Sequence, residues 1–196
     1  MQEVKVGAYD VAYMGPYIYT MVHESVGYNA FARETGTLNG IIVVAKDSPI
    51  KKLEDLRFKS IAFPAPDSFA ATHLPLDNLK KLRIPVTQQY VGSHLSVYLA
   101  VAKGLVPAGG GIIGTFNELK PEVRDKLRIL WETPDYMPLP FAANARISKE
   151  VVDKLRAAMI AMSHDPKGRA LLAGIGFKGI ISANDSNYDN VRALIK

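Results

Sequence analysis

Residues 40–63, GIIVVAKDSPIKKLEDLRFKSIAF, contain the pattern that decides the fold class. Gly40–Ala45 is a continuous apolar run with the length of a buried strand, and Ser60–Phe63 is a second short strand. Asp47–Pro49 turns the chain between them, and Lys51–Leu56 can form one or two helical turns. Strands separated by helical segments in this way are typical of an α/β sheet.

The same alternation continues on both sides of this stretch. Further strands are predicted at 4–13, 87–91, 105–113 and 127–131, and helices at 17–26, 69–82, 93–103, 148–162, 183–195 and after Pro121 and Asp165. Pro75 lacks an N–H group and is expected to disturb the helix over 69–82, which then begins near Leu74. The fold class predicted from this order is α/β with mostly parallel sheets.

Composition limits the function classes. The chain has 196 residues, 48% of them hydrophobic, and a net charge of +5 that is scattered along the sequence. Its length allows one domain or two small lobes. No cysteine is present, which excludes disulfides and thiolate chemistry. The sequence has no basic run of the kind that indicates a nucleic-acid partner. It has no stretch long and apolar enough to span a bilayer. No signal peptide is expected ahead of the first predicted strand.

Enzymatic readings find little support in the sequence. Ser68, His94 and an aspartate would be needed for a hydrolytic triad, but no G-x-S-x-G turn is present and Ser68 lies in a proline-rich loop. The histidines at 23, 73, 94 and 164 have none of the spacings typical of a metal site. The sequence therefore predicts no enzyme, no metal and no cofactor.

Five stretches, taken together and in order, resemble the phosphate/phosphite/phosphonate-binding proteins of ABC importers. They are GAYDVAY at 7–13 with Gly15-Pro16-Tyr17, VVAKDSPI at 43–50 with LEDL at 53–56, IAF at 61–63 through Pro66-Asp67-Ser68 to Pro75, Gly92-Ser93-His94 with AVAKG at 100–104, and the block from Leu171 to Tyr188.

This resemblance implies a two-lobe fold of the type II periplasmic-binding-protein class that closes on its ligand by a hinge. Lobe one is expected at 1–39 plus 139–196, and lobe two at 40–138. Members of the family carry further strand–helix pairs ahead of the Tyr-Asp strand, so lobe one is expected to be incomplete, and a homodimer is expected to cover it. The resemblance also implies a periplasmic location and an ABC transporter permease as partner.

The resemblance implies ligand contacts at two helix starts of lobe two. Ser68, Phe69 and Ala70 match a family run whose hydroxyls and free N–H groups bind phosphoryl oxygens. Ser93 and His94 match the start of the next helix, where the histidine faces the ligand. Ser68 could instead be only an N-cap, Ser93 favours capping, and His94 could be a half-buried histidine bonded to backbone.

Two further residues complete the predicted site. Tyr13 could donate its hydroxyl to a ligand from lobe one, although packing is the more common role of an aromatic residue near a turn. Thr115 follows the glycine run at 109–111 and could reach the ligand. Asp10 and Asp185 match family positions and are interpreted as structural.

The function predicted by the resemblance is capture of a small phosphate- or phosphonate-like oxyanion for an ABC importer. Three alternatives remain open. The chain could be a truncated or decayed binding or sensor domain with no transport role, it could take a different small organic ligand, or it could be the effector domain of a regulator of similar fold.

Overall fold

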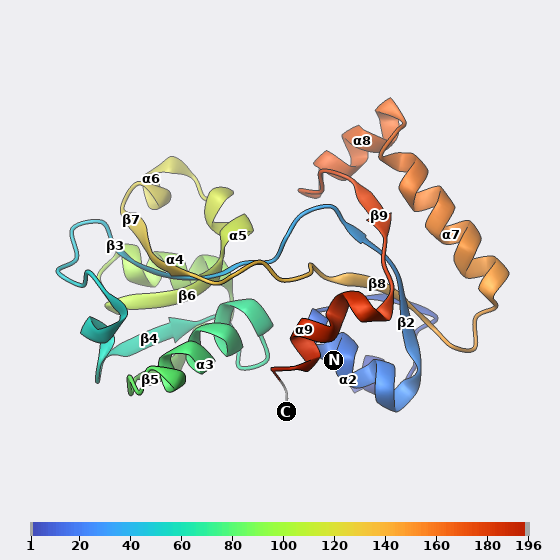
Figure 1. Ribbon diagram of the computed structural model, residues 1–196. Helices are drawn as coiled ribbons and strands as arrows, with labels where there is room; N and C mark the ends of the chain where they lie inside the picture. The colour runs from blue at the N-terminus through green and yellow to red at the C-terminus, as the bar shows by residue number, and fades with distance from the viewer. Residues whose placement is uncertain (1, 195–196) are drawn as a thin grey trace. The chain divides into compact units, whose positions relative to one another are not determined.

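The computed structural model describes residues 2–194, which divide into two compact units (Figure 1). Unit 1 is Met1–Thr37 with Tyr136–Lys196, and unit 2 is Leu38–Asp135. The chain passes into unit 2 once and returns once, because unit 2 is a single continuous segment inserted into unit 1. These boundaries lie within a few residues of the lobe limits expected from the sequence.

Unit 2 contains the segment with which the sequence analysis began. Its sheet has the strand order β5-β4-β6-β3-β7. The strands are β3 (Gly40–Ala45), β4 (Ser60–Phe63), β5 (Thr87–Tyr90), β6 (Ala108–Ile112) and β7 (Leu127–Glu132). The expected parallel pairing is found around β4, which runs parallel to β5 and β6. By contrast, β3 pairs antiparallel with β6 and with β7. Strand β3 enters the unit and its antiparallel neighbour β7 leaves it.

Helices cover both faces of this sheet. They are η1 (Leu53–Leu56), η2 (Phe69–His73), α3 (Leu74–Lys81), α4 (His94–Ala102), α5 (Ile113–Asn117) and α6 (Pro121–Arg124). One face buries Val97 and Val101 of α4 against Ile41 of β3. The other face buries Leu79 of α3 against Ile42 and neighbouring apolar side chains. The all-apolar sequence of β3 follows from this burial on both sides.

A widened helical turn precedes α3, and Pro75 explains it. The segment η2 is a π-helix, in which the Leu74 N–H donates to the Phe69 carbonyl five residues back. An ordinary α-turn would need an N–H at position 75 for the Ala71 carbonyl, and proline has none. The expected disturbance at Pro75 and the start of α3 at Leu74 are both confirmed.

The sheet accepts this π-turn at very short range because its strands present glycines there. A Cβ added at Gly40 would lie 2.0 Å from the Ala70 carbonyl oxygen, and one added at Gly110 would lie 2.2 Å from the Ala71 carbonyl oxygen. The glycine run of β6 thus permits close packing of a backbone on a sheet rather than forming a phosphate loop. It also sets the position of the chain just after Ser68.

Unit 1 has a sheet with the order β1-β8-β2-β9. Its elements are α1 (Gln2–Lys5), β1 (Val11–Tyr13), α2 (Pro16–Val26), β2 (Tyr28–Glu34), β8 (Pro140–Asn144), α7 (Lys149–Met162), α8 (Pro166–Ala173), β9 (Ile180–Ser182), η3 (Asp185–Tyr188) and α9 (Asp189–Arg192). All its strand pairs are antiparallel, so the expected parallel pairing does not extend to this unit. In the central pair, β2 leads toward unit 2 and β8 leads back.

Several sequence expectations in unit 1 need correction. The strand predicted over 4–13 is limited to β1, because α1 and a turn occupy the residues before it. Strands β2, β8 and β9 were not predicted. The sequences YNAFARE and PFAAN hold several alanines, which are depleted in strands, so pairing with neighbours rather than propensity determines their conformation.

Polar contacts tie the C-terminal segment to α2. The Tyr19 hydroxyl donates to the Asp185 carboxylate at 2.9 Å. Arg192 pairs with the same carboxylate at 2.7 Å and with Glu24 at 3.4 Å. Asp10 pairs with Arg146 at 2.7 Å. The structural interpretation of Asp10 and Asp185 is therefore supported.

Within residues 2–194, no helix has both the length and the apolar character needed to cross a membrane.

Candidate functional site

The parallel strands of unit 2 bring predicted site residues to one edge of its sheet. Strands β4, β5 and β6 all end at this edge, since β4 is parallel to both of its neighbours. Ser68 follows β4, His94 follows β5 and Thr115 follows β6. The carboxyl ends of strands in open α/β sheets are the usual ligand-binding edge. The topology of unit 2 thus places three of the predicted residues on the side where binding is favoured.

Ser68 starts the first helical segment at this edge without capping it. Its side chain makes no cap hydrogen bond, whereas its carbonyl accepts from the N–H groups of Thr72 at 3.0 Å and His73 at 3.1 Å. The Ser68 hydroxyl therefore does not cap the helix, although the N-cap interpretation requires it to accept a main-chain N–H. The first N–H groups of a helix have no acceptor within it, and here they belong to the turn that contains Ala70.

Phe69 and Ala70 hold this turn in place. Both side chains are buried, and the Ala70 carbonyl oxygen approaches Gly40 of β3. The Thr72 hydroxyl donates to the Ala65 carbonyl at 2.8 Å and so fixes the loop before Ser68. Sequence reasoning missed Thr72, whose only signal is its place one helical turn after Ser68. At Phe69 and Ala70 only the main chain carries a hydrogen-bond donor, because neither side chain has one.

Ser93 and His94 start α4 beside β5, with different roles. The Ser93 hydroxyl accepts from the Ser96 N–H at 3.1 Å, which confirms the capping role. His94 is half-buried, and its Nδ1 atom is buried without a hydrogen-bond partner among residues 2–194. Burial lowers the pKa of His94 below its ordinary value, so the neutral ring is favoured. The alternative interpretation was that His94 is bonded to backbone. At Nδ1 the described residues provide no such hydrogen bond.

Thr115 is already engaged by its neighbours. Its hydroxyl lies 2.9 Å from the Tyr98 hydroxyl and donates to the Ile112 carbonyl at 3.1 Å. Tyr98 in turn accepts from the Ile112 N–H at 3.1 Å. This arrangement ties α4 to the end of β6. Sequence reasoning missed Tyr98, although its spacing of four residues from His94 places both on one side of α4.

Tyr13 belongs to unit 1, where it packs as an aromatic residue. It lies on β1 with its ring 4.6 Å from that of Phe141 and 5.8 Å from that of Phe177. Burial, with a smaller effect of Glu34, raises the pKa of Tyr13 to about 12. Its side chain is still 41% exposed, so its edge is open to solvent.

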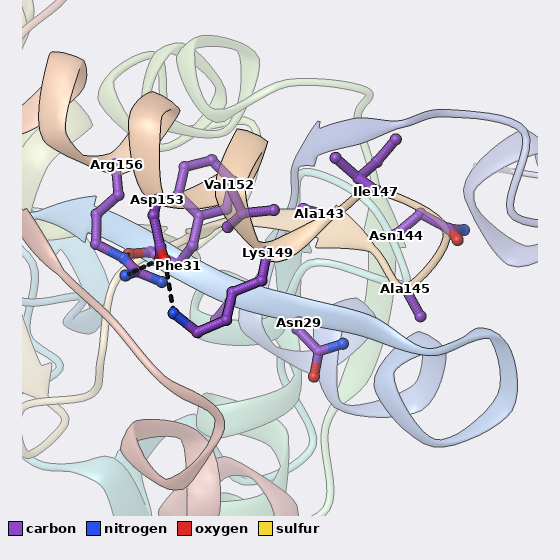
Figure 2. A pocket seen from close by; sticks show the side chains of 11 residues that line it. Asn29, Phe31, Ala143, Asn144, Ala145, Ile147, Lys149, Val152, Asp153 and Arg156 are labelled. Carbon is purple, nitrogen blue, oxygen red and sulfur yellow. Dashed lines mark hydrogen bonds and ion pairs between the residues drawn. The ribbon is translucent and has the colours of Figure 1, made fainter.

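Unit 1 also has a hollow of about 430 Å³ that no sequence signal indicated (Figure 2). It lies where the start of α7 faces β2 and β8. Both of its cations share one carboxylate, because Asp153 pairs with Lys149 at 2.6 Å and with Arg156 at 2.7 Å. Arg156 Nε also donates to the Phe31 carbonyl at 3.0 Å. These contacts favour a role of the charged residues in holding α7 on the sheet.

Comparison with known proteins gives a consistent result. Residues 1–188 match the family described as "ABC transporter, phosphonate, periplasmic substrate-binding protein". A binding protein component of an ABC phosphonate transporter from Pseudomonas aeruginosa is 19% identical, with a TM-score of 0.82 over 99% of this chain and 70% of that one. PhnD1 from Prochlorococcus marinus, in complex with methylphosphonate, is 17% identical, with a TM-score of 0.85 over 98% of this chain and 79% of that one.

A third similar structure is a Xanthomonas citri protein bound to ATP, 19% identical, with a TM-score of 0.80 over 98% of this chain and 78% of that one. At these identities the likeness to solved structures shows the fold, which is the expected two-lobe α/β class. The match of the family to residues 1–188 is the observation that bears on membership. Among residues 2–194, no group of three His, Cys, Asp or Glu side chains is arranged to hold a metal ion.

Proposed function

Because the chain belongs to the phosphonate periplasmic substrate-binding proteins of ABC transporters, we propose that it captures a small phosphate- or phosphonate-like oxyanion. The family consists of transporter binding proteins rather than enzymes, so the chain binds its ligand without converting it. The observation that carries the proposal is the shared strand edge of unit 2. It combines a helical start at Ser68 with a buried, unpartnered nitrogen of His94.

The donors at this edge suit an oxyanion. The Ser68 hydroxyl and the first N–H groups of the η2–α3 segment can each donate to an acceptor oxygen. His94 can donate from one ring nitrogen when neutral and from both when protonated. A negative ligand favours the protonated ring, so binding offsets the burial that lowers the pKa of His94. Ser93 and Thr115 contribute by holding α4 in place, since their hydroxyls already have partners.

The family implies a periplasmic location and an ABC transporter permease as partner, and we propose both for this chain. PhnD1 of Prochlorococcus marinus is bound to methylphosphonate. Methylphosphonate is therefore the first probe. Comparison with phosphate, phosphite and sulfate tests whether the methyl group and the phosphorus centre of the ligand are recognised.

A thermal-shift screen tests the proposed function. We expect at least one of methylphosphonate, phosphite or phosphate to raise the unfolding midpoint, because a ligand that binds only the folded state stabilises it by about 2.7 kcal/mol at a hundredfold excess over Kd. The screen is repeated by calorimetric titration to obtain Kd. A flat screen on cooperatively folded protein would contradict the proposal and favour a decayed domain or a different organic ligand.

We also propose that unit 1 forms a homodimer through the free edge of β1. Among the strands formed by residues 2–194, β1 pairs only with β8, and its Val11 is 39% exposed. A short apolar edge strand offers backbone groups and apolar contact to a second copy. We expect sedimentation velocity to show a dimer that Val11→Lys converts to monomer. Val151→Lys on α7, where Val151 is 47% exposed, is the control. A monomer at every concentration would contradict this proposal.

A further inference from the structure

The opposite edge of the unit 2 sheet carries a different chemistry from the candidate ligand site. Strands β4, β5 and β6 all begin there, with Ser60 opposite Thr87 and Ile61 opposite Ala108. Residues 57–59, 80–86 and 103–107 lead into these three strands. The Phe58 N–H donates to the Pro85 carbonyl at 2.7 Å, which fastens the first of these segments to the second. The start of β4 and the end of α3 accordingly lie at the same end of the unit (Figure 1).

These three segments carry positive charges and have no acidic residues of their own to balance them. Residues 57–59, 80–86 and 103–107 contain no aspartate or glutamate. Their cations are Arg57, Lys59, Lys80, Lys81, Arg83 and Lys103, and all six are exposed. Lys81 pairs with Asp77 of α3 at 2.6 Å. Asp55 of η1 accepts the backbone N–H groups of Lys51 and Lys52.

The same edge exposes large apolar side chains. Phe58 is 79% exposed, Leu105 74% and Leu82 47%. Each has a cation next to it or two residues away in the sequence. We define the basic edge by the following six residues: Arg57, Phe58, Lys59, Leu82, Arg83 and Leu105. An apolar side chain flanked by cations at the tip of a loop is unlike a buried core residue and unlike an ordinary polar loop.

Two residues at this edge have a left-handed backbone conformation. Phe58 has φ 62° and Arg83 has φ 55°, and within residues 2–194 they are the only residues other than glycine with positive φ. The left-handed region disfavours side chains with a Cβ, and a bulky residue there is an outlier. Glycine would remove the strain at position 58 but would also remove the ring. Arg83 directly follows the C-cap Leu82, and the Ile84 N–H donates to the Leu79 carbonyl at 2.9 Å, so its left-handed conformation ends α3. Phe58 is the residue of interest, because strained backbone of this kind clusters at functional sites.

We propose that the basic edge docks unit 2 onto an anionic lipid surface. Phe58 and Leu105 enter the boundary between headgroups and acyl chains, and Arg57, Lys59 and Arg83 contact the headgroup phosphates. Basic clusters near a membrane are attracted to anionic lipids, and aromatic rings favour the interfacial depth. A lipid surface suits side chains that project from separate loop tips, because a protein partner would need a pocket for each of them.

This docking is independent of ligand capture. The basic edge lies at the beginnings of β4, β5 and β6, whereas Ser68 and His94 lie beyond their ends. A surface-bound protein could therefore keep its ligand edge accessible. The two functions are also distinguishable by experiment, since variants of the basic edge leave the candidate ligand residues unchanged.

Co-sedimentation with vesicles tests the proposal. We expect the protein to bind vesicles of equal parts phosphatidylcholine and phosphatidylglycerol and not vesicles of phosphatidylcholine alone. Binding should be lost at about 1 M salt, where the Debye length is only about 3 Å. The combined variant Arg57→Gln, Lys59→Gln, Arg83→Gln should lower the partition coefficient by about tenfold or more. Phe58→Gly should lower it severalfold while the unfolding midpoint stays equal or rises, because the strain is relieved.

The control variant combines Lys167→Gln with Leu171→Ala on α8 of unit 1, where Leu171 is 59% exposed. It removes a similar cation and a similar apolar side chain elsewhere and should bind vesicles like the original protein. Three results would overturn the proposal: no binding to anionic vesicles, equal binding to neutral vesicles, or unchanged binding by the combined variant. Direct binding to polyglutamate, together with no binding to anionic vesicles, would point instead to an acidic protein partner.

Discussion

Gly110→Ala is expected to lower the free energy of unfolding by about 3 kcal/mol, because overpacking a close-packed contact costs roughly 1–3 kcal/mol and occasionally more. The added Cβ would lie 2.2 Å from the Ala71 carbonyl oxygen and 2.5 Å from the Phe63 ring. The first obstacle is backbone and cannot rotate away, so the η2 turn must move off the sheet. Urea unfolding followed by circular dichroism measures the loss, which corresponds to a fall in Tm of about 6–12 °C.

The matched control for this substitution is Gly114→Ala. Gly114 lies in α5 with nothing within 4 Å of an added Cβ, and its φ is not positive. Alanine favours a helix over glycine by up to about 1 kcal/mol, so this variant should be equally stable or slightly more stable. Since Ser68 directly precedes η2, Gly110→Ala should also weaken oxyanion binding. Unchanged stability of Gly110→Ala would show that the close approach of η2 to β6 is wrong.

His94→Ala is expected to weaken binding of the best oxyanion from the screen by about 10- to 100-fold, since a hydrogen bond to a charged group contributes roughly 1.5–3 kcal/mol. The physical reason is the buried Nδ1, which has no partner among the described residues and can be satisfied by ligand binding. His94→Gln, which keeps a donor, should lose less. His164→Ala is the control, because this histidine of unit 1 is exposed and is hydrogen-bonded through its main-chain N–H and carbonyl.

The pH dependence of His94 gives the same prediction an independent readout. Burial lowers the pKa of His94 in the folded protein, so the stability contributed by the neutral ring is present above the unfolded value of about 6.5 and is lost as pH falls. The binding of an anion raises this pKa, and proton uptake on binding should therefore be measurable near pH 7 by titration in buffers of different ionisation enthalpy. Equal uptake by His94→Ala would assign the proton to another group.

The sequence predicted much of unit 2 and less of unit 1. The apolar runs of β3 and β4, the start of α3 near Leu74 and the cap at Ser93 could be predicted because each depends on residues close together in the chain. By contrast, β8 has the sequence PFAAN, and it is a strand because Ala142 pairs with Ala12 on one side and Ala30 on the other. No local pattern reports a partner that lies more than a hundred residues away.

The candidate site divides in the same way. The family resemblance and the residue types indicated Ser68, Ser93, His94, Thr115 and Tyr13 as candidates. Tertiary structure separated their roles, because Thr115 is held by Tyr98 and Tyr13 packs on Phe141, whereas the Ser68 side chain makes no cap bond. A hydroxyl that already donates its hydrogen to a neighbour in space cannot also donate it to a ligand.

Residue order alone thus established an α/β chain of the phosphonate-binding type, with helix starts and stops set by prolines, caps and apolar periodicity, which are local interactions. Three-dimensional packing alone decided the antiparallel sheet of unit 1, the π-turn that rests on Gly40 and Gly110, and the attachment of the Phe58 segment to the Arg83 segment through the Pro85 carbonyl. Each of these depends on contacts between segments that are far apart in the chain, and such contacts exist only once the strands have paired.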